Sequence, residues 1–91
     1  MKREDVLINW LQIKVVADAR PTDQSALDTA AFFLQLLQED HLIHELGYRK
    51  EGGRYVLFGL SESGPWESQY PVEIVESLLI AIESEPKYNQ S

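Results

Sequence analysis

The sequence has no cysteine, few basic residues and no long hydrophobic run. The lack of cysteine excludes disulfide bonds, thiolate nucleophiles and every metal site that depends on a thiolate ligand. No apolar run approaches the roughly 18–20 residues that a membrane-spanning helix needs, so we expect no membrane segment. Glu4, Asp5 and Lys14 interrupt the apolar stretch near the first residue, which argues against a signal peptide. We therefore expect a soluble, cytoplasmic protein.

Basic residues are scarce and unevenly placed. Eight Lys and Arg residues stand against 15 Asp and Glu residues, which gives a formal charge of −7. There is no Lys or Arg between Pro21 and Tyr48, whereas Arg49, Lys50 and Arg54 lie close together. A negative field of this kind repels phosphate backbones and attracts basic protein surfaces. We expect a basic protein partner, and nucleic acid is disfavoured.

The length and composition predict a single small globular domain over residues 1–91, with residues 86–91 as a frayed tail. A chain this short buries only about 60–65% of its unfolded surface, so a second copy could cover apolar area that the first leaves exposed. We therefore expect a homodimer.

A glycine pair organises the middle of the chain. Gly52-Gly53 separates two apolar runs, and adjacent glycines tolerate the positive φ angles that tight hairpin turns require. We expect an antiparallel β-hairpin here. The second run is nearly unbroken, which predicts burial on both faces and helices packed against the sheet. The two runs contain Leu42, Ile43, Leu46 and Tyr48 before the turn and Tyr55, Val56, Leu57, Phe58 and Leu60 after it.

The first segment predicts a helix over residues 3–17, because its apolar residues recur at helical spacing. Around Gln12 the apolar and polar residues alternate, and Val15-Val16 is a β-branched pair. These features leave a strand over residues 12–17 open as an alternative. The break at Arg20-Pro21 ends the segment, since the residue before proline avoids the helical region.

A second helix is predicted over residues 26–38. Ser25 with Asp28 three residues later has the form of a capping box. The segment has few polar positions, which predicts that it is covered on more than one side and forms the centre of the core. Glu39-Asp40 would be unfavourable at the negative end of a helix, so the helix stops before them or they serve another purpose.

The chain after the hairpin is predicted to form a loop over residues 61–71, because turn-forming residues are frequent there. Pro71 then opens an amphipathic C-terminal helix that ends at Glu85-Pro86. Trp66 and Tyr70 give the loop the composition of an interface hot spot, with Trp66 packed on the core as the alternative. The residues that we expect to bind a partner are Trp66, Tyr70, Glu67, Arg49, Lys50 and Arg54.

No constellation of residues supports catalysis. His41 and His44 would share a helical face, but they lie where a helix is expected to give way to a strand, so we expect no metal site. The segment from Gly59 to Ser63 departs from a nucleophile elbow at its last position, and no glycine-rich loop opens a helix. We therefore expect a protein that is not an enzyme and that needs no cofactor.

Residues 25–64 include FFLQLLQEDHLIHELGYRKEGGRYVLFGLSESG. This run resembles the last helix and the wing of winged-helix transcription regulators of the MarR and PadR kinds. The resemblance implies a hairpin whose tip, with Arg49, Lys50 and Arg54, contacts DNA. A recognition helix needs cations or amides that face the DNA, whereas this helix carries Asp28 and no Lys or Arg.

Together these patterns predict an α+β fold with two N-terminal helices, an antiparallel β-hairpin that a third strand could extend, and a C-terminal amphipathic helix. The function we expect is a small acidic, non-enzymatic interaction module that binds or inhibits a protein partner. The alternative is a degenerate winged-helix-like transcription regulator that contacts DNA through its wing.

Overall fold

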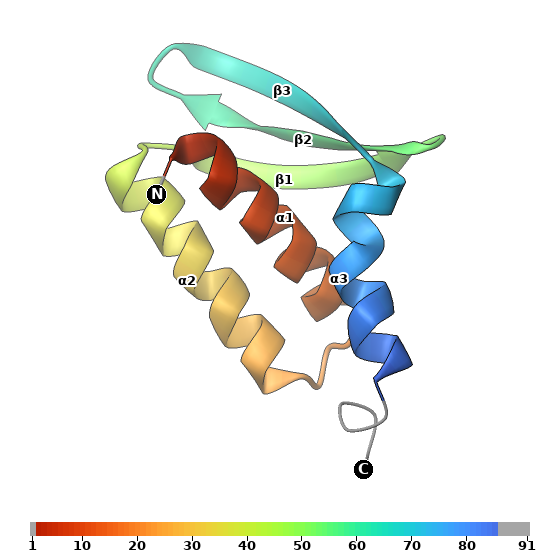
Figure 1. Cartoon of the computed structure of the whole chain (residues 1–91). Helices are drawn as coiled ribbons and strands as arrows, with labels where there is room; N and C mark the ends of the chain where they lie inside the picture. The colour runs from red at the N-terminus through yellow and green to blue at the C-terminus, as the bar shows by residue number, and fades with distance from the viewer. Residues whose placement is uncertain (1, 86–91) are drawn as a thin grey trace.

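The predicted α+β fold is confirmed in a computed structural model, which describes residues 2–85. Two helices come first, three antiparallel strands follow, and one helix closes the described part of the chain (Figure 1). The predicted tail at residues 86–91 lies outside this range. The elements are α1 (Arg3–Ala19), α2 (Gln24–Asp40), β1 (His44–Glu51), β2 (Arg54–Ser61), β3 (Gly64–Pro71) and α3 (Val72–Ser84).

The three strands form a meander in the order β1-β2-β3. The predicted hairpin at Gly52-Gly53 is confirmed, and Gly52 adopts the positive φ of 59° that favours glycine. The loop predicted for residues 61–71 is wrong, because most of it forms β3. Exposed and half-buried residues alternate along β3, and its two prolines lie on an edge strand, where fewer backbone N–H groups are needed for pairing.

All three helices lie on one face of the sheet, with α1 between α2 and α3 (Figure 1). We call the covered face the inner face and the other the outer face. Within residues 2–85 no helix covers the outer face, and the predicted burial of β2 on both faces is right for Val56 but wrong for Phe58, which is half-buried, and Leu60, which is exposed. Three helices in a single layer can cover only one side of the sheet.

The centre of the core is α1 rather than α2, which corrects the sequence-based prediction. α2 lies at the edge of the helix layer and buries only Ala26, Ala30 and Leu37. Phe33 of α2 packs against the helix core, whereas Phe58 faces the outer side of the sheet, so these two rings do not meet. The buried residues of α1 are Val6, Leu7, Trp10, Leu11, Ile13, Val15, Val16 and Ala17.

The alternative of a strand over residues 12–17 is excluded, since α1 continues to Ala19. Val15 and Val16 are both buried, so packing on several sides overrides their preference for strands. The side-chain amide of Gln12 donates to the carbonyl of Ile74 at 2.9 Å and joins α1 to α3. No helix within residues 2–85 has the length and apolar composition to cross a membrane.

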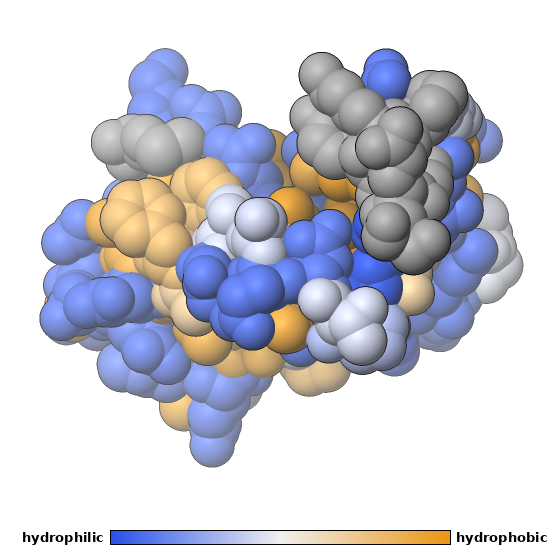
Figure 2. Space-filling view, turned by 90° about the horizontal axis from the view of Figure 1, so that it is seen from below, coloured by the Kyte–Doolittle hydropathy of each residue, from blue (hydrophilic) through white to orange (hydrophobic). Residues whose placement is uncertain are grey.

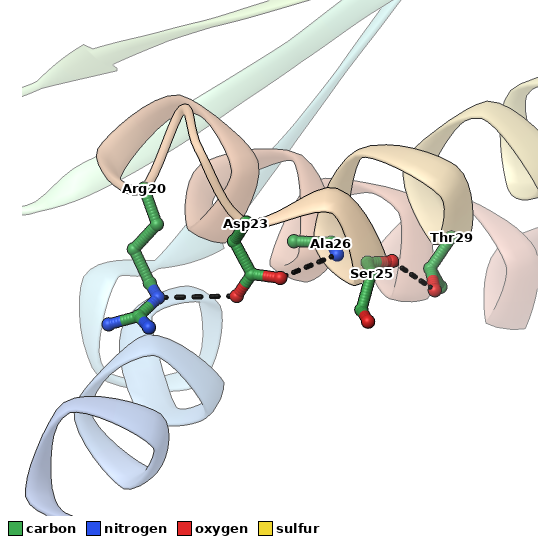
Figure 3. A network of polar contacts seen from close by, with 5 residues as sticks. All are labelled: Arg20, Asp23, Ser25, Ala26 and Thr29. Carbon is green, nitrogen blue, oxygen red and sulfur yellow. Dashed lines mark hydrogen bonds and ion pairs between the residues drawn. The ribbon is translucent and has the colours of Figure 1, made fainter. Parts of the chain in front are cut away.

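The N-cap of α2 is Asp23 rather than Ser25, and Figure 3 shows the arrangement. The Asp23 carboxylate accepts the backbone N–H of Ala26 at 3.1 Å, and Arg20 Nε lies 3.3 Å from its other oxygen. The Ala26 bond, followed by Arg20, lowers the pKa of Asp23. Ser25 instead belongs to the first turn, where its carbonyl accepts the hydroxyl of Thr29. The helix also runs two residues beyond the predicted end, to Asp40.

This cap gives a direct stability prediction. Replacing Asp23 with Ala removes the acceptor for a helix N–H, and we expect a loss of about 1 kcal/mol in the free energy of unfolding. Ser25→Ala is the matched control and should change this free energy by less than about 0.5 kcal/mol. Urea unfolding of both variants makes the comparison. A larger loss for Ser25→Ala than for Asp23→Ala would contradict the assignment.

Candidate interaction surfaces

The outer face of the sheet has an apolar centre. Val56, Phe58 and Leu60 of β2 share this face, and Val56 is buried although no helix lies over it. The ring of Phe58 lies over Gly47 of β1, where an added Cβ would be only 2.8 Å from the ring atoms. A side chain at position 47 would therefore displace this ring. Glycine at this position keeps the aromatic side chain over the face of the sheet.

Charged groups of both signs flank the apolar centre. Arg49 on β1 donates to Glu51 and lies 3.3 Å from Glu67 on β3. Its guanidinium is also 5.7 Å from the centroid of the Phe58 ring, within cation–π range. The Arg54 guanidinium donates to the Gln69 amide at 2.7 Å. These contacts hold the polar side chains over β1 and β3 and leave part of the Phe58 ring uncovered.

One end of the outer face is hollowed. The hollow has a volume of about 650 Å³ and combines an apolar floor with charged groups at its margin. It is open to one side, and its lining includes one guanidinium and two carboxylates. It is lined by Glu45, Arg49, Phe58, Gly59, Leu60, Pro65, Trp66 and Glu67.

The six residues predicted to bind a partner divide between the two faces. Arg49, Arg54 and Glu67 are exposed, and by their register they belong to the outer face. The other three are Trp66, Tyr70 and Lys50, which by their register belong to the inner face, although Trp66 also lines the hollow. Trp66 and Tyr70 are half-buried and pack against the main core cluster.

The Trp66 side chain is held close to the first turn of α1. The Arg3 guanidinium lies 5.4 Å from its ring centroid. Its indole Nε1 is buried, and within the described residues it has no hydrogen-bond partner. Burial raises the pKa of the hydroxyl of Tyr70, which lies on the same strand. The alternative in which Trp66 packs on the core agrees with this position, and the role of this residue in partner binding stays a prediction.

Lys50 takes part in a polar network that ties the sheet to α3. Its ammonium lies 3.0 Å from the Glu76 carboxylate, and the Tyr55 hydroxyl donates to the same carboxylate oxygen at 2.5 Å. The bond from Tyr55 and then the contact with Lys50 lower the pKa of Glu76. Burial, followed by the bond to Glu76, raises the pKa of Tyr55 to about 12.

The Glu76 network predicts a pH dependence of stability. A carboxylate whose pKa is lowered by folding stabilises the folded state above its unfolded pKa, and this contribution is lost as the pH falls through the folded value. We expect wild-type stability to decline as the pH is lowered through and below 4.5, the ordinary pKa of this carboxyl. Glu76→Gln should lose less stability over the same interval. Thermal unfolding at a series of pH values tests this, and an unchanged slope in the variant would contradict it.

A second candidate surface lies on the outward side of α2. Phe32 is 57% exposed and Leu27 is 39% exposed, although the helix over residues 26–38 was predicted to be covered on more than one side. Phe32 lies at helical spacing from Asp28 and Glu39, so an aromatic side chain interrupts a polar stripe. Figure 2 shows apolar surface beside hydrophilic surface on the side where α2 lies. We call Leu27, Asp28, Phe32, Gln35 and Glu39 the α2 surface.

The carboxylates at the end of α2 have no positively charged partner within the described residues. Glu39 and Asp40 occupy its last turn, and no basic residue lies there. Among the described residues neither carboxylate has an ion-pair or hydrogen-bond partner. Negative charge at this end of a helix is unfavourable by about 0.3–1 kcal/mol for each group. These groups therefore lower the stability of the isolated chain.

The exposed apolar residues of α3 have a different setting. Ile74 and Ile80 are 50% and 59% exposed. However, Glu76 is held by Lys50 and Tyr55, and both Glu83 and Glu85 have interaction partners. The Glu76 carboxylate of α3 is thus engaged within the chain, unlike the carboxylates at the end of α2. This contrast makes α2 the better candidate for a partner that carries charge.

Among the described residues the structure shows neither a cluster of metal ligands nor a serine placed as a catalytic nucleophile. Within residues 2–85 no group of three or more His, Asp or Glu side chains is placed to hold a metal ion. His41 follows the end of α2 and His44 begins β1. The Ser61 hydroxyl donates to the carbonyl of Gly64 in the turn before β3.

Comparison of the chain with protein-family models, with curated proteins and with solved structures finds no match. The functional argument therefore depends on the surfaces described above.

Two features of these surfaces were missed from the sequence, although each leaves a signal. Phe58 was assigned to the core, but its alternation with Leu57 places it on the opposite side of the sheet from that buried residue. Phe32 was not singled out from the sequence, yet residues 28, 32, 35 and 39 follow one helical stripe that is otherwise polar. In both cases the periodicity separates the exposed ring from the buried face.

Proposed function

We propose that this protein is a small acidic, non-enzymatic interaction module whose α2 surface binds a basic segment of another protein. The observation that carries this proposal is the exposure of Phe32 on a helix face that has carboxylates and no cation. A large aromatic side chain surrounded by polar groups is the usual composition of an interface hot spot. The cytoplasmic location expected from the sequence is part of this proposal.

The charge of the α2 surface supports the choice of partner. Asp28 and Glu39 flank Phe32 along the helix, and no Lys or Arg occurs anywhere from Pro21 to Tyr48. A partner with Lys or Arg beside an apolar side chain would supply both contacts that this face lacks. The chain's overall charge of −7 would attract such a partner from a distance and speed its association.

The carboxylates at the end of α2 add a second reason. Glu39 and Asp40 lower the stability of the free chain because they lie at the negative end of the helix dipole. A basic partner would neutralise them, so binding would relieve an unfavourable interaction. The negative charges of Glu39 and Asp40 would therefore add to the affinity for the partner, although they do not stabilise the free protein.

The alternative function, DNA binding through a wing, has less support. Arg49 is paired with Glu51 and Glu67, Lys50 with Glu76, and Arg54 with the Gln69 amide. Binding to phosphate would first have to break these contacts. The carboxylates beside the tip would also repel a phosphate backbone.

Fluorescence anisotropy with three defined probes tests the proposal. The probes are a basic amphipathic peptide of Leu and Lys, a matched acidic peptide of Leu and Glu, and a DNA duplex, each at moderate salt. We expect binding of the basic peptide alone. Salt-sensitive binding of the duplex would favour the transcription-regulator alternative, and equal binding of both peptides would contradict a role for charge.

A further inference from the structure

We propose that the outer face of the sheet is a homodimer interface, on which a second copy of this chain packs sheet against sheet. The proposed basic partner uses the α2 surface, so the two interfaces are separate. The inference rests on the apolar centre of the outer face and on the placement of its charges.

The outer face has the layout of an interface rather than of an ordinary solvated surface. Its middle strand contributes Val56, Phe58 and Leu60, so the centre of the face is wholly apolar. The side strands contribute most of the polar and charged groups, among them Arg49 and Glu67, and Arg54 lies at the end of the middle strand. An apolar centre within a polar rim is the usual arrangement of a specific protein interface.

The charges of this face complement one another under a two-fold rotation. Arg49 lies on β1, whereas Glu67 and Gln69 lie on β3, on the other side of the apolar centre. An axis parallel to β2 sets β1 of one copy over β3 of the other. Arg49 of each copy then lies next to Gln69 and Glu67 of the second copy. The α2 surface has no such complementarity, because it carries only negative charge.

The opposite choice of axis is unfavourable. An axis across the strands would stack β1 on β1 and bring Glu51 of one copy toward Glu45 of the other. These two carboxylates would repel each other. Both axes keep the strands of the two sheets near the alignment of about 30° that is common in β-sandwiches, so the charges decide between them.

The size of the face is adequate for a reversible dimer. Eight residues of strand at 3.3 Å each extend about 26 Å, and three strands 4.8 Å apart are about 14 Å wide. Because side chains stand out from the sheet, two such faces would bury on the order of 1,000 Å². This is near the lower limit for a specific interface, which predicts micromolar rather than nanomolar dissociation.

Charge reversal tests both the face and its axis. Arg49→Glu and Glu67→Arg each place like charges opposite one another across the proposed interface, twice in every homodimer. We expect each variant to raise the dimer dissociation constant about tenfold or more. An equal mixture of the two variants restores opposite charges at both contacts between copies, although each chain still lacks its internal Arg49–Glu67 pair. Sedimentation equilibrium at tens of micromolar measures the masses, and circular dichroism verifies the fold.

The expected results are an average mass approaching twice 10.4 kDa for the wild type, an average mass clearly moved toward 10.4 kDa for each variant alone, and recovery of the wild-type mass in the mixture. Phe32→Ser is the matched control on the other surface and should leave the dimer intact. A wild type that stays at the monomer mass would overturn the proposal. Variants that dimerise as the wild type does, a mixture that stays monomeric, or loss of the dimer in Phe32→Ser would also overturn it.

Discussion

Leu11→Ala is expected to lower the free energy of unfolding by about 2–5 kcal/mol. Leu11 is fully buried in the middle of α1, where it belongs to the core cluster that joins this helix to the sheet. Removing its side chain leaves a cavity that neighbouring helices on both sides cannot easily fill. For a domain of this size the loss is a large part of the total stability. Urea unfolding monitored by circular dichroism measures it.

Ile80→Ala is the control for this prediction. It removes a comparable aliphatic side chain that is 59% exposed on α3, so we expect a change of less than about 0.5 kcal/mol. A similar loss in the two variants would show that α1 is not the centre of the core. A loss below about 1 kcal/mol for Leu11→Ala would do the same.

Phe32→Ser is expected to weaken binding of the basic Leu and Lys peptide by about thirtyfold, which corresponds to about 2 kcal/mol. The variant removes the exposed aromatic group of the α2 surface and leaves the acidic side chains in place. Stability should change little, because Phe32 is 57% exposed. Fluorescence anisotropy with the labelled peptide gives the affinity, and thermal unfolding verifies that the fold is retained.

Ile80→Ser is the matched control, because Ile80 is as exposed as Phe32 but lies on α3, where the Glu76 carboxylate is engaged by Lys50 and Tyr55. We expect its affinity for the peptide to equal that of the wild type. Equal losses in the two variants would mean that the peptide binds any exposed apolar side chain of this acidic protein. In that case the α2 surface would have no special role.

The order of the elements could be predicted from the sequence because several local signals agree. The glycine pair at residues 52–53 fixes the hairpin, since a positive φ at Gly52 is accessible to few other residues. The helical spacing of apolar residues correctly predicts α1 and α3. These signals are local, and the hairpin and the two helices lie where the signals predict them.

The third strand was missed because its local signals point elsewhere. Pro65 and Pro71 disfavour a strand when they are considered alone, and Gly64 favours a turn. Pairing with β2 overrides these tendencies, since β3 needs backbone partners on only one side. The cap at Asp23 was missed for a different reason, because Ser25 with Asp28 also fits a capping pattern two residues later.

The interaction surfaces could not be predicted because exposure depends on the placement of whole elements. Phe58 was assigned to the core because of its hydrophobicity, and Phe32 was not singled out as a surface residue. The structure exposes Phe32 because α2 lies at the edge of the helix layer, and it places Phe58 on the outer face because all helices lie on the inner face. The local periodicity separates the two faces of each element, but it does not say which of these faces the rest of the chain covers.

Mapping of the basic peptide on the isotopically labelled protein by NMR is the most direct test of the α2 surface as the partner site. As peptide is added, we expect the backbone amide signals of Leu27, Asp28, Phe32, Gln35 and Glu39 to shift most. Amides of Val56, Phe58 and Glu67 on the outer face should stay near their starting positions. Shifts concentrated on the outer face, or spread evenly over the acidic surface, would contradict the proposed function.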